Sequence, residues 1–66
     1  MFLRLTDING NLILVNLDKV ADFSYEKYSK NEWRYAVYFI GGGFVFVQET
    51  VSEISQLLQS VGKVVK

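Results

Sequence analysis

The chain of 66 residues contains neither cysteine nor histidine. Without cysteine no disulfide bond can stabilise it, and without both residue types the usual nitrogen and sulfur ligands of a zinc or copper site are missing. We therefore expect no cofactor. Histidine is also the side chain on which general acid–base catalysis and nucleophile activation most often depend. Because no nucleophile elbow, phosphate-binding loop or dinucleotide fingerprint is present either, the sequence predicts a protein that is not an enzyme.

A surplus of charge of either sign is missing as well. Seven basic and seven acidic side chains give a formal net charge of zero, whereas a protein that binds double-stranded nucleic acid normally presents a basic surface. No apolar run approaches the roughly 18 residues that would cross a bilayer, and the first residues, MFLRLTD, lack the pattern of a signal peptide. We expect a cytoplasmic protein that binds neither double-stranded nucleic acid nor a membrane. It would act in a bacterial cell or, as a phage protein, in the host cytoplasm.

The chain is short for a stable core. Its 66 residues have room for one small domain, residues 1–66, and a domain of this size buries only about 60% of the surface that its unfolded chain exposes. Half of the residues are hydrophobic. With disulfide bonds and a zinc or copper ion excluded, another subunit is the remaining source of stability. We expect a homo-oligomer, a dimer or a tetramer.

Alternation and turn residues predict five strands. They are expected at Phe2–Thr6 and at residues 12–17, 20–28, 33–40 and 44–48. Asn9-Gly10 favours a two-residue type I′ turn, in which both residues have positive φ. Gly41-Gly42-Gly43 is interpreted as a flexible hairpin turn and not as a phosphate cradle, because it connects two strands.

The clearest signal is a helix at the C-terminal end. Thr50-Val51-Ser52-Glu53 has the form of a capping box, in which the Thr50 hydroxyl caps the first turn and Glu53 reaches back. The apolar residues that follow recur at helical spacing, and Gly62 is expected to end the helix. This stripe comprises Val51, Ile54, Leu57, Leu58 and Val61. The predicted fold is α+β: five short antiparallel strands, in a small curled or barrel-like sheet, followed by one C-terminal amphipathic helix.

Both faces of the predicted sheet are apolar. If residues 29–32 form the loop, Tyr28 lies opposite Trp33 and Glu26 opposite Tyr35. One face then carries Trp33, Tyr35, Val37, Phe39, Val45 and Val47. The other, which we expect the helix to cover, carries Ala21, Phe23, Tyr25, Ala36, Tyr38, Ile40, Phe44 and Phe46. The first hairpin has Leu3, Leu5, Leu12 and Leu14 on one side and Phe2, Ile13, Val15 and Leu17 on the other. Either the sheet curls into a barrel or a neighbouring copy covers the second face. Because large apolar patches are rare on soluble monomers, we expect the neighbouring copy.

Several segments resemble the short proteins of the FlbD type, which are associated with bacterial flagellar operons. The resemblance runs through LTDINGNLILVN and FVFVQETVSEISQLL. Within them, the matching elements are Leu5-Thr6, Asn9-Gly10, Asn16 and Val47-Gln48-Glu49-Thr50. The middle hairpin is longer and more aromatic than the turn usual in that family. The resemblance implies a small fold of strands and a final helix and, as one possible role, an accessory protein of a flagellar operon.

The stretch YEKYSKNEWRYAVY, residues 25–38, is the feature with binding potential. Bases stack on aromatic rings, and arginine adds stacking and phosphate contacts. The predicted binding residues are Tyr28, Trp33, Arg34, Tyr35 and Arg4. We expect a non-enzymatic binding or adaptor module whose aromatic sheet face binds itself or another protein. The alternative is a sponge that sequesters a small, anionic cyclic nucleotide immune signal and would resemble the compact oligomeric phage proteins that capture such signals.

Overall fold

The computed structural model describes residues 1–60, which form five antiparallel strands and one C-terminal helix. In chain order the elements are β1 (Phe2–Thr6), β2 (Leu12–Asn16), the short 3-10 helix η1 (Leu17–Lys19), β3 (Val20–Ser29), β4 (Glu32–Phe39), β5 (Phe44–Val47) and α1 (Val51–Ser60). The strands form two sheets, β1-β2 and β3-β4-β5. The expected α+β fold is confirmed, although the strands form two separate sheets and do not close into a barrel.

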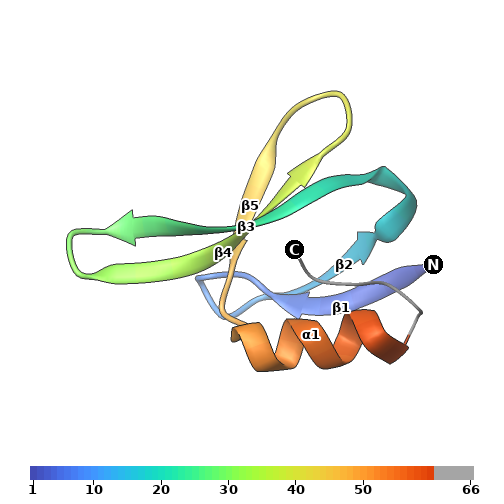
Figure 1. Cartoon of the computed structure of the whole chain (residues 1–66). Coiled ribbons are helices and arrows are strands. Elements are labelled where there is room, and N and C mark those ends of the chain that lie inside the picture. Colours follow the sequence, from blue (N-terminus) through green and yellow to red (C-terminus); the bar gives the residue numbers. More distant parts are fainter. Residues whose placement is uncertain (61–66) are drawn as a thin grey trace.

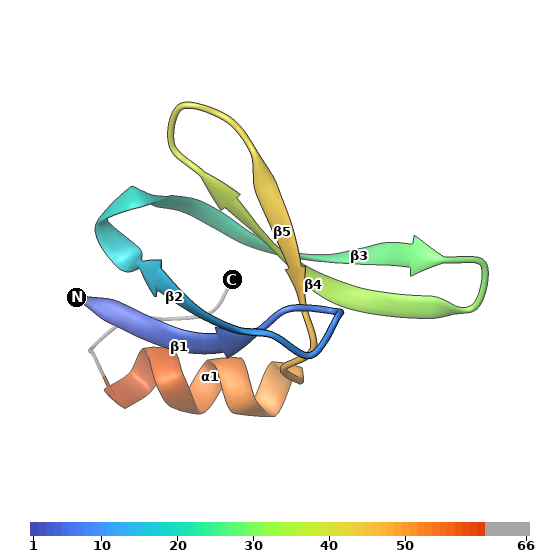
Figure 2. The same ribbon diagram turned by 180° about the vertical axis from the view of Figure 1, so that it is seen from behind.

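The β1-β2 hairpin lies between α1 and the three-stranded sheet, as two opposite views show (Figures 1 and 2). The two sheets meet where β1 and β5 end. There the Gln48 N–H donates to the Thr6 carbonyl oxygen at 2.8 Å, and Asp7 forms an isolated bridge with Val47. This junction places the start of α1 beside the end of β1.

Both sheets and the helix contribute to one hydrophobic core. Its buried members are Leu3, Leu5, Val15, Tyr35, Val37, Val47, Ile54 and Leu58. Burying apolar surface is the main favourable term in folding, and here it requires β1, β2, β4, β5 and α1 together. No single hairpin of this chain has a core of its own.

The first turn differs from the expected type I′ geometry, because only Gly10 has positive φ, at 86°. The Asp7 carbonyl oxygen accepts from the Gly10 N–H at 3.1 Å, and the Asp7 N–H donates to the Asn11 carbonyl oxygen at 2.9 Å. Three residues, 8–10, therefore form the loop, with glycine in the left-handed position that such loops favour. The Asp7 carboxylate adds support by accepting from the backbone N–H groups of Asn9 and Asn11.

This longer loop changes which side chains share a face of the first hairpin. Leu3 pairs with Val15 and Leu5 with Ile13. The expected grouping of Leu3 and Leu5 with Leu12 and Leu14 is wrong, because a shift of one residue turns every side chain of a strand to the other face. Leu12 and Leu14 are exposed.

The second hairpin differs from expectation in the same way. Ser29 pairs with Glu32, so the turn has two residues, and a register shift between Lys27 and Ser29 leaves Tyr28 in a bulge. Tyr25 consequently pairs with Tyr35. The expected pairings of Tyr28 with Trp33 and of Glu26 with Tyr35 are wrong.

The core face of the three-stranded sheet is the one that was expected to be uncovered. Tyr35, Val37 and Val47 are buried in the core. The side chains expected under the helix at Tyr38, Phe44 and Phe46 belong to the opposite face, because Tyr38 pairs with Phe44 and Ala36 with Phe46. The expected grouping of the β4 and β5 side chains is correct, and the bulge at Tyr28 changes only which β3 residues share their faces. The reversal arises because the β1-β2 hairpin and α1 pack on the side of Tyr35, Val37 and Val47.

The helix begins as the capping box predicts. The Glu53 N–H donates to the Thr50 hydroxyl oxygen at 3.2 Å, and the Thr50 N–H donates to the Glu53 carboxylate at 3.2 Å. Ile54 and Leu58 are buried, whereas Val51 is exposed. The predictions for Val61 and Gly62 lie outside the described residues. Among residues 1–60 no helix is long and apolar enough to span a bilayer.

Candidate binding pocket and outer aromatic face

The five predicted binding residues fall at three different places. Trp33, Arg34 and Tyr35 line one pocket. Tyr28 lies on the other side of the sheet, where its ring contacts Phe46. Arg4 lines a separate groove beside α1. The structure thus brings together three of the five, and these are consecutive in the chain.

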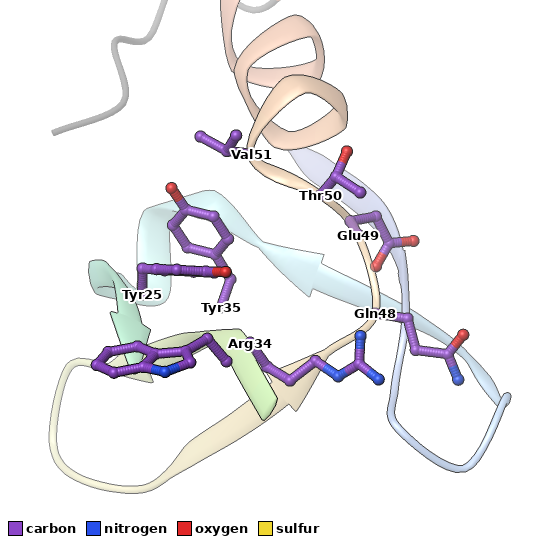
Figure 3. A pocket seen from close by; sticks show the side chains of 8 residues that line it. Tyr25, Arg34, Tyr35, Gln48, Glu49, Thr50 and Val51 are labelled. Carbon is purple, nitrogen blue, oxygen red and sulfur yellow. The ribbon is translucent and has the colours of Figure 1, made fainter. Parts of the chain in front are cut away.

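The pocket lies between the β3-β4 hairpin and the connection from β5 to α1, and its volume is about 440 Å³. Its lining residues are Tyr25, Trp33, Arg34, Tyr35, Gln48, Glu49, Thr50 and Val51. Figure 3 shows the rings of Tyr25 and Tyr35 on one side, with Glu49 and the guanidinium of Arg34 on the other. The pocket therefore has an apolar end and a polar end.

Tyr25, Trp33 and Tyr35 form what we call the aromatic wall. The ring centroids of Tyr25 and Trp33 are 5.7 Å apart at an interplanar angle of 28°, and those of Tyr25 and Tyr35 are 5.1 Å apart at 48°. Tyr35 is buried in the core, while Tyr25 is 58% and Trp33 51% exposed. The wall is therefore anchored at Tyr35 and offers the other two rings to solvent.

The polar end carries charges of both signs. An Arg34 terminal nitrogen donates to the Glu32 carboxylate at 2.8 Å, and the Arg34 Nε is shielded from solvent without a hydrogen-bond partner in the described part of the chain. Glu49 accepts from the Thr6 N–H at 2.9 Å through Oε1. This backbone contact holds Glu49 at the junction of the two sheets.

The opposite face of the three-stranded sheet carries a second aromatic cluster. We call Tyr28, Tyr38, Phe44 and Phe46 the outer aromatic face. Phe44 contacts the rings of both Tyr38 and Phe46, at centroid distances of 5.3 and 5.4 Å, and Tyr28 meets Phe46 at 5.1 Å. Its rings hold one another in place along β3, β4 and β5.

One carboxylate is tied to this face. The Tyr38 hydroxyl lies 2.8 and 2.7 Å from the two carboxylate oxygens of Glu26, to which it donates. This hydrogen bond raises the pKa of Tyr38, with smaller contributions from desolvation and from the negative charges of Glu26 and Asp22. The polar atoms of Tyr38 and Glu26 thus satisfy each other within an aromatic surface.

The groove of Arg4 is bounded by β1 and α1. It has a volume of about 410 Å³, and its lining includes Glu49, Glu53 and Leu57. Within residues 1–60 no carboxylate lies within ion-pair distance of Arg4. Glu53 is already bonded to Thr50 in the capping box. Arg4 does not contribute to the aromatic pocket.

Sequence reasoning missed two important members of the pocket. Tyr25 was expected in the core under the helix, yet it is exposed and lines the pocket. Glu49 was named only as an element of the resemblance to FlbD-type proteins, and its position at the pocket follows from its contact with Thr6, 43 residues away in the chain. The position of Tyr25 at the pocket follows from the bulge at Tyr28, which makes Tyr35 the pairing partner of Tyr25.

Searches against protein-family models, curated proteins and solved structures find no match to this chain. The resemblance to proteins of the FlbD type accordingly stays a prediction, as does the role in a flagellar operon that it implies.

Proposed function

We propose that the protein is a non-enzymatic, homo-oligomeric binding module in which a second copy of the chain covers the outer aromatic face. The main observation in support of this proposal is that the rings of the outer aromatic face, which pack on one another, are exposed on the side of the sheet away from the core. Phe44 is 53% exposed even though it contacts Tyr38 and Phe46. Aromatic residues are enriched in the buried centres of protein interfaces, where they supply large contact areas.

Properties of the whole chain support the second copy as the occupant. The formal net charge is zero, so two copies do not repel each other through net charge, and proteins near zero charge associate readily. A chain this small gains stability when another subunit buries its remaining apolar surface. A twofold dimer, the commonest oligomer, would place the same face on both copies and cover both at once.

The absence of histidine and cysteine from the sequence supports a binding role over catalysis. The proposed place of action is the cytoplasm. Cell fractionation with an antibody against the chain tests that location.

Sedimentation equilibrium at micromolar concentration tests the proposal. We expect the unmodified protein to sediment as a dimer or a larger oligomer. Phe44→Ser should shift the equilibrium towards monomer by about tenfold or more in dissociation constant, which corresponds to about 1.4 kcal/mol. Leu14→Ser is the matched control, because Leu14 is 68% exposed on the other hairpin. It should leave the assembly unchanged.

Two results would contradict the proposal. A stable monomer of the unmodified protein at micromolar concentration would exclude self-association in this range. An oligomer that Leu14→Ser dissociates and Phe44→Ser does not would place the interface on the β1-β2 hairpin.

A further inference from the structure

We propose that the aromatic pocket binds a nucleobase, whose ring stacks on the aromatic wall and whose edge is held by Arg34 and Glu49. The aromatic wall of this site lies on the other side of the sheet from the proposed self-association interface. Three features of the pocket support a nucleobase as its ligand: the arrangement of the aromatic rings, the hydrogen-bond donors and acceptors of the polar end, and the charges around Arg34.

The aromatic wall provides a preset stacking surface. Tyr25 and Trp33 already lie in an offset stack, with centroids 5.7 Å apart at 28°. A flat ring does not fit between them at this separation, so it would stack on their exposed surfaces facing the pocket. Tyr35, which is buried, fixes the position of Tyr25 from the core side. Proteins that bind unpaired bases commonly use such rings as platforms.

The polar end requires a ligand with donors and acceptors. A guanidinium donates only and a carboxylate accepts only. Figure 3 shows the Arg34 guanidinium and Glu49 on the same side, opposite the rings. The edge of a nucleobase offers both kinds of group in one plane; guanine, for example, presents acceptors at O6 and N7 and N–H donors beside them. A simple anion offers no donor, and a quaternary ammonium group offers neither donor nor acceptor.

The charges favour recognition of the ring over recognition of phosphate. Arg34 already donates to Glu32 at 2.8 Å, and Glu49 adds a second negative charge to the site. A phosphate group would therefore meet a cation that is already paired. A nucleoside should therefore bind about as well as its monophosphate, in contrast to the expectation that Arg34 captures an anionic ligand.

The aromatic wall and the outer aromatic face lie on opposite sides of the three-stranded sheet, whereas Arg34 pairs with Glu26, which is bonded to Tyr38 of the outer aromatic face. Tyr25 and Tyr35 form one cross-strand pair, and Tyr38 and Phe44 form another on the reverse face. A second copy on the outer aromatic face would leave the aromatic wall open. Ligand binding and self-association can therefore be tested separately.

The experiment uses the intrinsic fluorescence of Trp33, the only tryptophan in the chain. Guanosine, guanosine monophosphate and a short single-stranded guanine-containing RNA are titrated into the protein, with ribose 5-phosphate and choline as ligands that lack a base. We expect guanosine and its monophosphate to quench Trp33 with dissociation constants within about threefold of each other, while ribose phosphate and choline leave the fluorescence unchanged. If guanosine monophosphate and the RNA bind with equal affinity, the source of the base is a free nucleotide. If the RNA binds at least about tenfold more tightly, the source of the base is single-stranded RNA.

Three variants in the pocket and one control on the opposite face assign the contacts. Tyr25→Ala should weaken guanosine binding by about tenfold through lost stacking, and Tyr25→Phe should restore it. Glu49→Gln keeps an oxygen for the Thr6 N–H but replaces the second carboxylate oxygen with a donor, so it should also weaken binding by about tenfold. Tyr28→Ala on the opposite face is the control and should leave binding unchanged.

The inference is overturned if guanosine and its monophosphate fail to quench Trp33 at millimolar concentration. Quenching by ribose phosphate or choline equal to that by guanosine also overturns it, as does full binding by Glu49→Gln. Repeating the titration with Phe44→Ser separates the two proposals. If this variant no longer assembles but guanosine still quenches Trp33, the result contradicts neither the pocket nor its ligand.

Discussion

At the scale of single residues, contacts between near neighbours in the chain are predictable and contacts across strands are not. The capping pair Thr50 and Glu53 lies three residues apart and forms as the sequence predicts. The hydrogen bond between Tyr38 and Glu26 joins residues 12 positions apart. It depends on the register of β3 against β4, which the sequence pattern alone did not define.

The hydrogen bond to Glu26 raises the pKa of Tyr38 above the ordinary tyrosine value. Because its pKa is raised in the folded state, the stabilisation is complete below the ordinary tyrosine pKa near 10 and is lost as the pH rises through the folded-state value. An alkaline titration followed by tyrosinate absorbance measures this pKa, as the difference between the unmodified protein and Tyr38→Phe. Glu26→Gln removes the negative charge beside the hydroxyl and should lower the pKa of Tyr38. An unchanged pKa in Glu26→Gln would contradict the assigned cause.

At the scale of elements, the sequence predicts which segments form strands and a helix, but not how the hairpins are aligned. Alternating apolar residues and turn residues mark all five strands within a few positions. The alignment is set by one extra loop residue in the first hairpin and by the bulge at Tyr28 in the second. Each change shifts the pairing by one position and exchanges the two faces. Both faces of β2, β4 and β5 carry apolar residues, so the hydrophobic pattern of these strands did not discriminate between the alignments. In contrast, β3 has a polar face, formed by Asp22, Ser24 and Glu26.

Substitution of Gly10 tests the geometry of the first turn. Its φ is 86°, and a Cβ added there would meet no atom within 4 Å. Gly10→Ala should therefore cost about 1–2 kcal/mol of unfolding free energy through backbone strain alone. Chemical synthesis allows D-alanine at the same position as a matched control, which should be neutral or slightly stabilising because its chirality favours positive φ. Urea denaturation measures both, and equal losses for the two substitutions would contradict the left-handed conformation.

At the scale of the whole molecule, a small core leaves apolar surface on both sheets. Phe2, Leu12 and Leu14 are exposed on the β1-β2 sheet, and Phe44 is exposed on the β3-β4-β5 sheet. The candidate pocket was partly predictable, because Trp33, Arg34 and Tyr35 are adjacent in the chain. Tyr25 and Glu49 were not, because one depends on strand register and the other on the junction of two sheets. The pocket is thus a product of the tertiary fold.

The core and the proposed assembly predict linked effects on thermal stability. Ile54 is fully buried between α1 and both sheets, so Ile54→Ala should cost about 2–5 kcal/mol. Stabilities of roughly 0.05–0.15 kcal/mol per residue are usual, and this loss would therefore remove much of the stability of so short a chain. Val51→Ala is the control on the same helix, because Val51 is 55% exposed and its truncation should cost less than about 0.5 kcal/mol.

Assembly should oppose this loss by mass action, since association with a second copy stabilises the folded state. The melting temperature of Ile54→Ala should therefore rise with protein concentration, and that of the unmodified protein should rise as well. Circular dichroism melts over about a hundredfold range of concentration measure both dependences. Melting of Ile54→Ala at the temperature of Val51→Ala would contradict the central position of Ile54 in the core. Melting temperatures that do not change with concentration would contradict the contribution of a second copy to stability, while leaving the fold of the single chain intact.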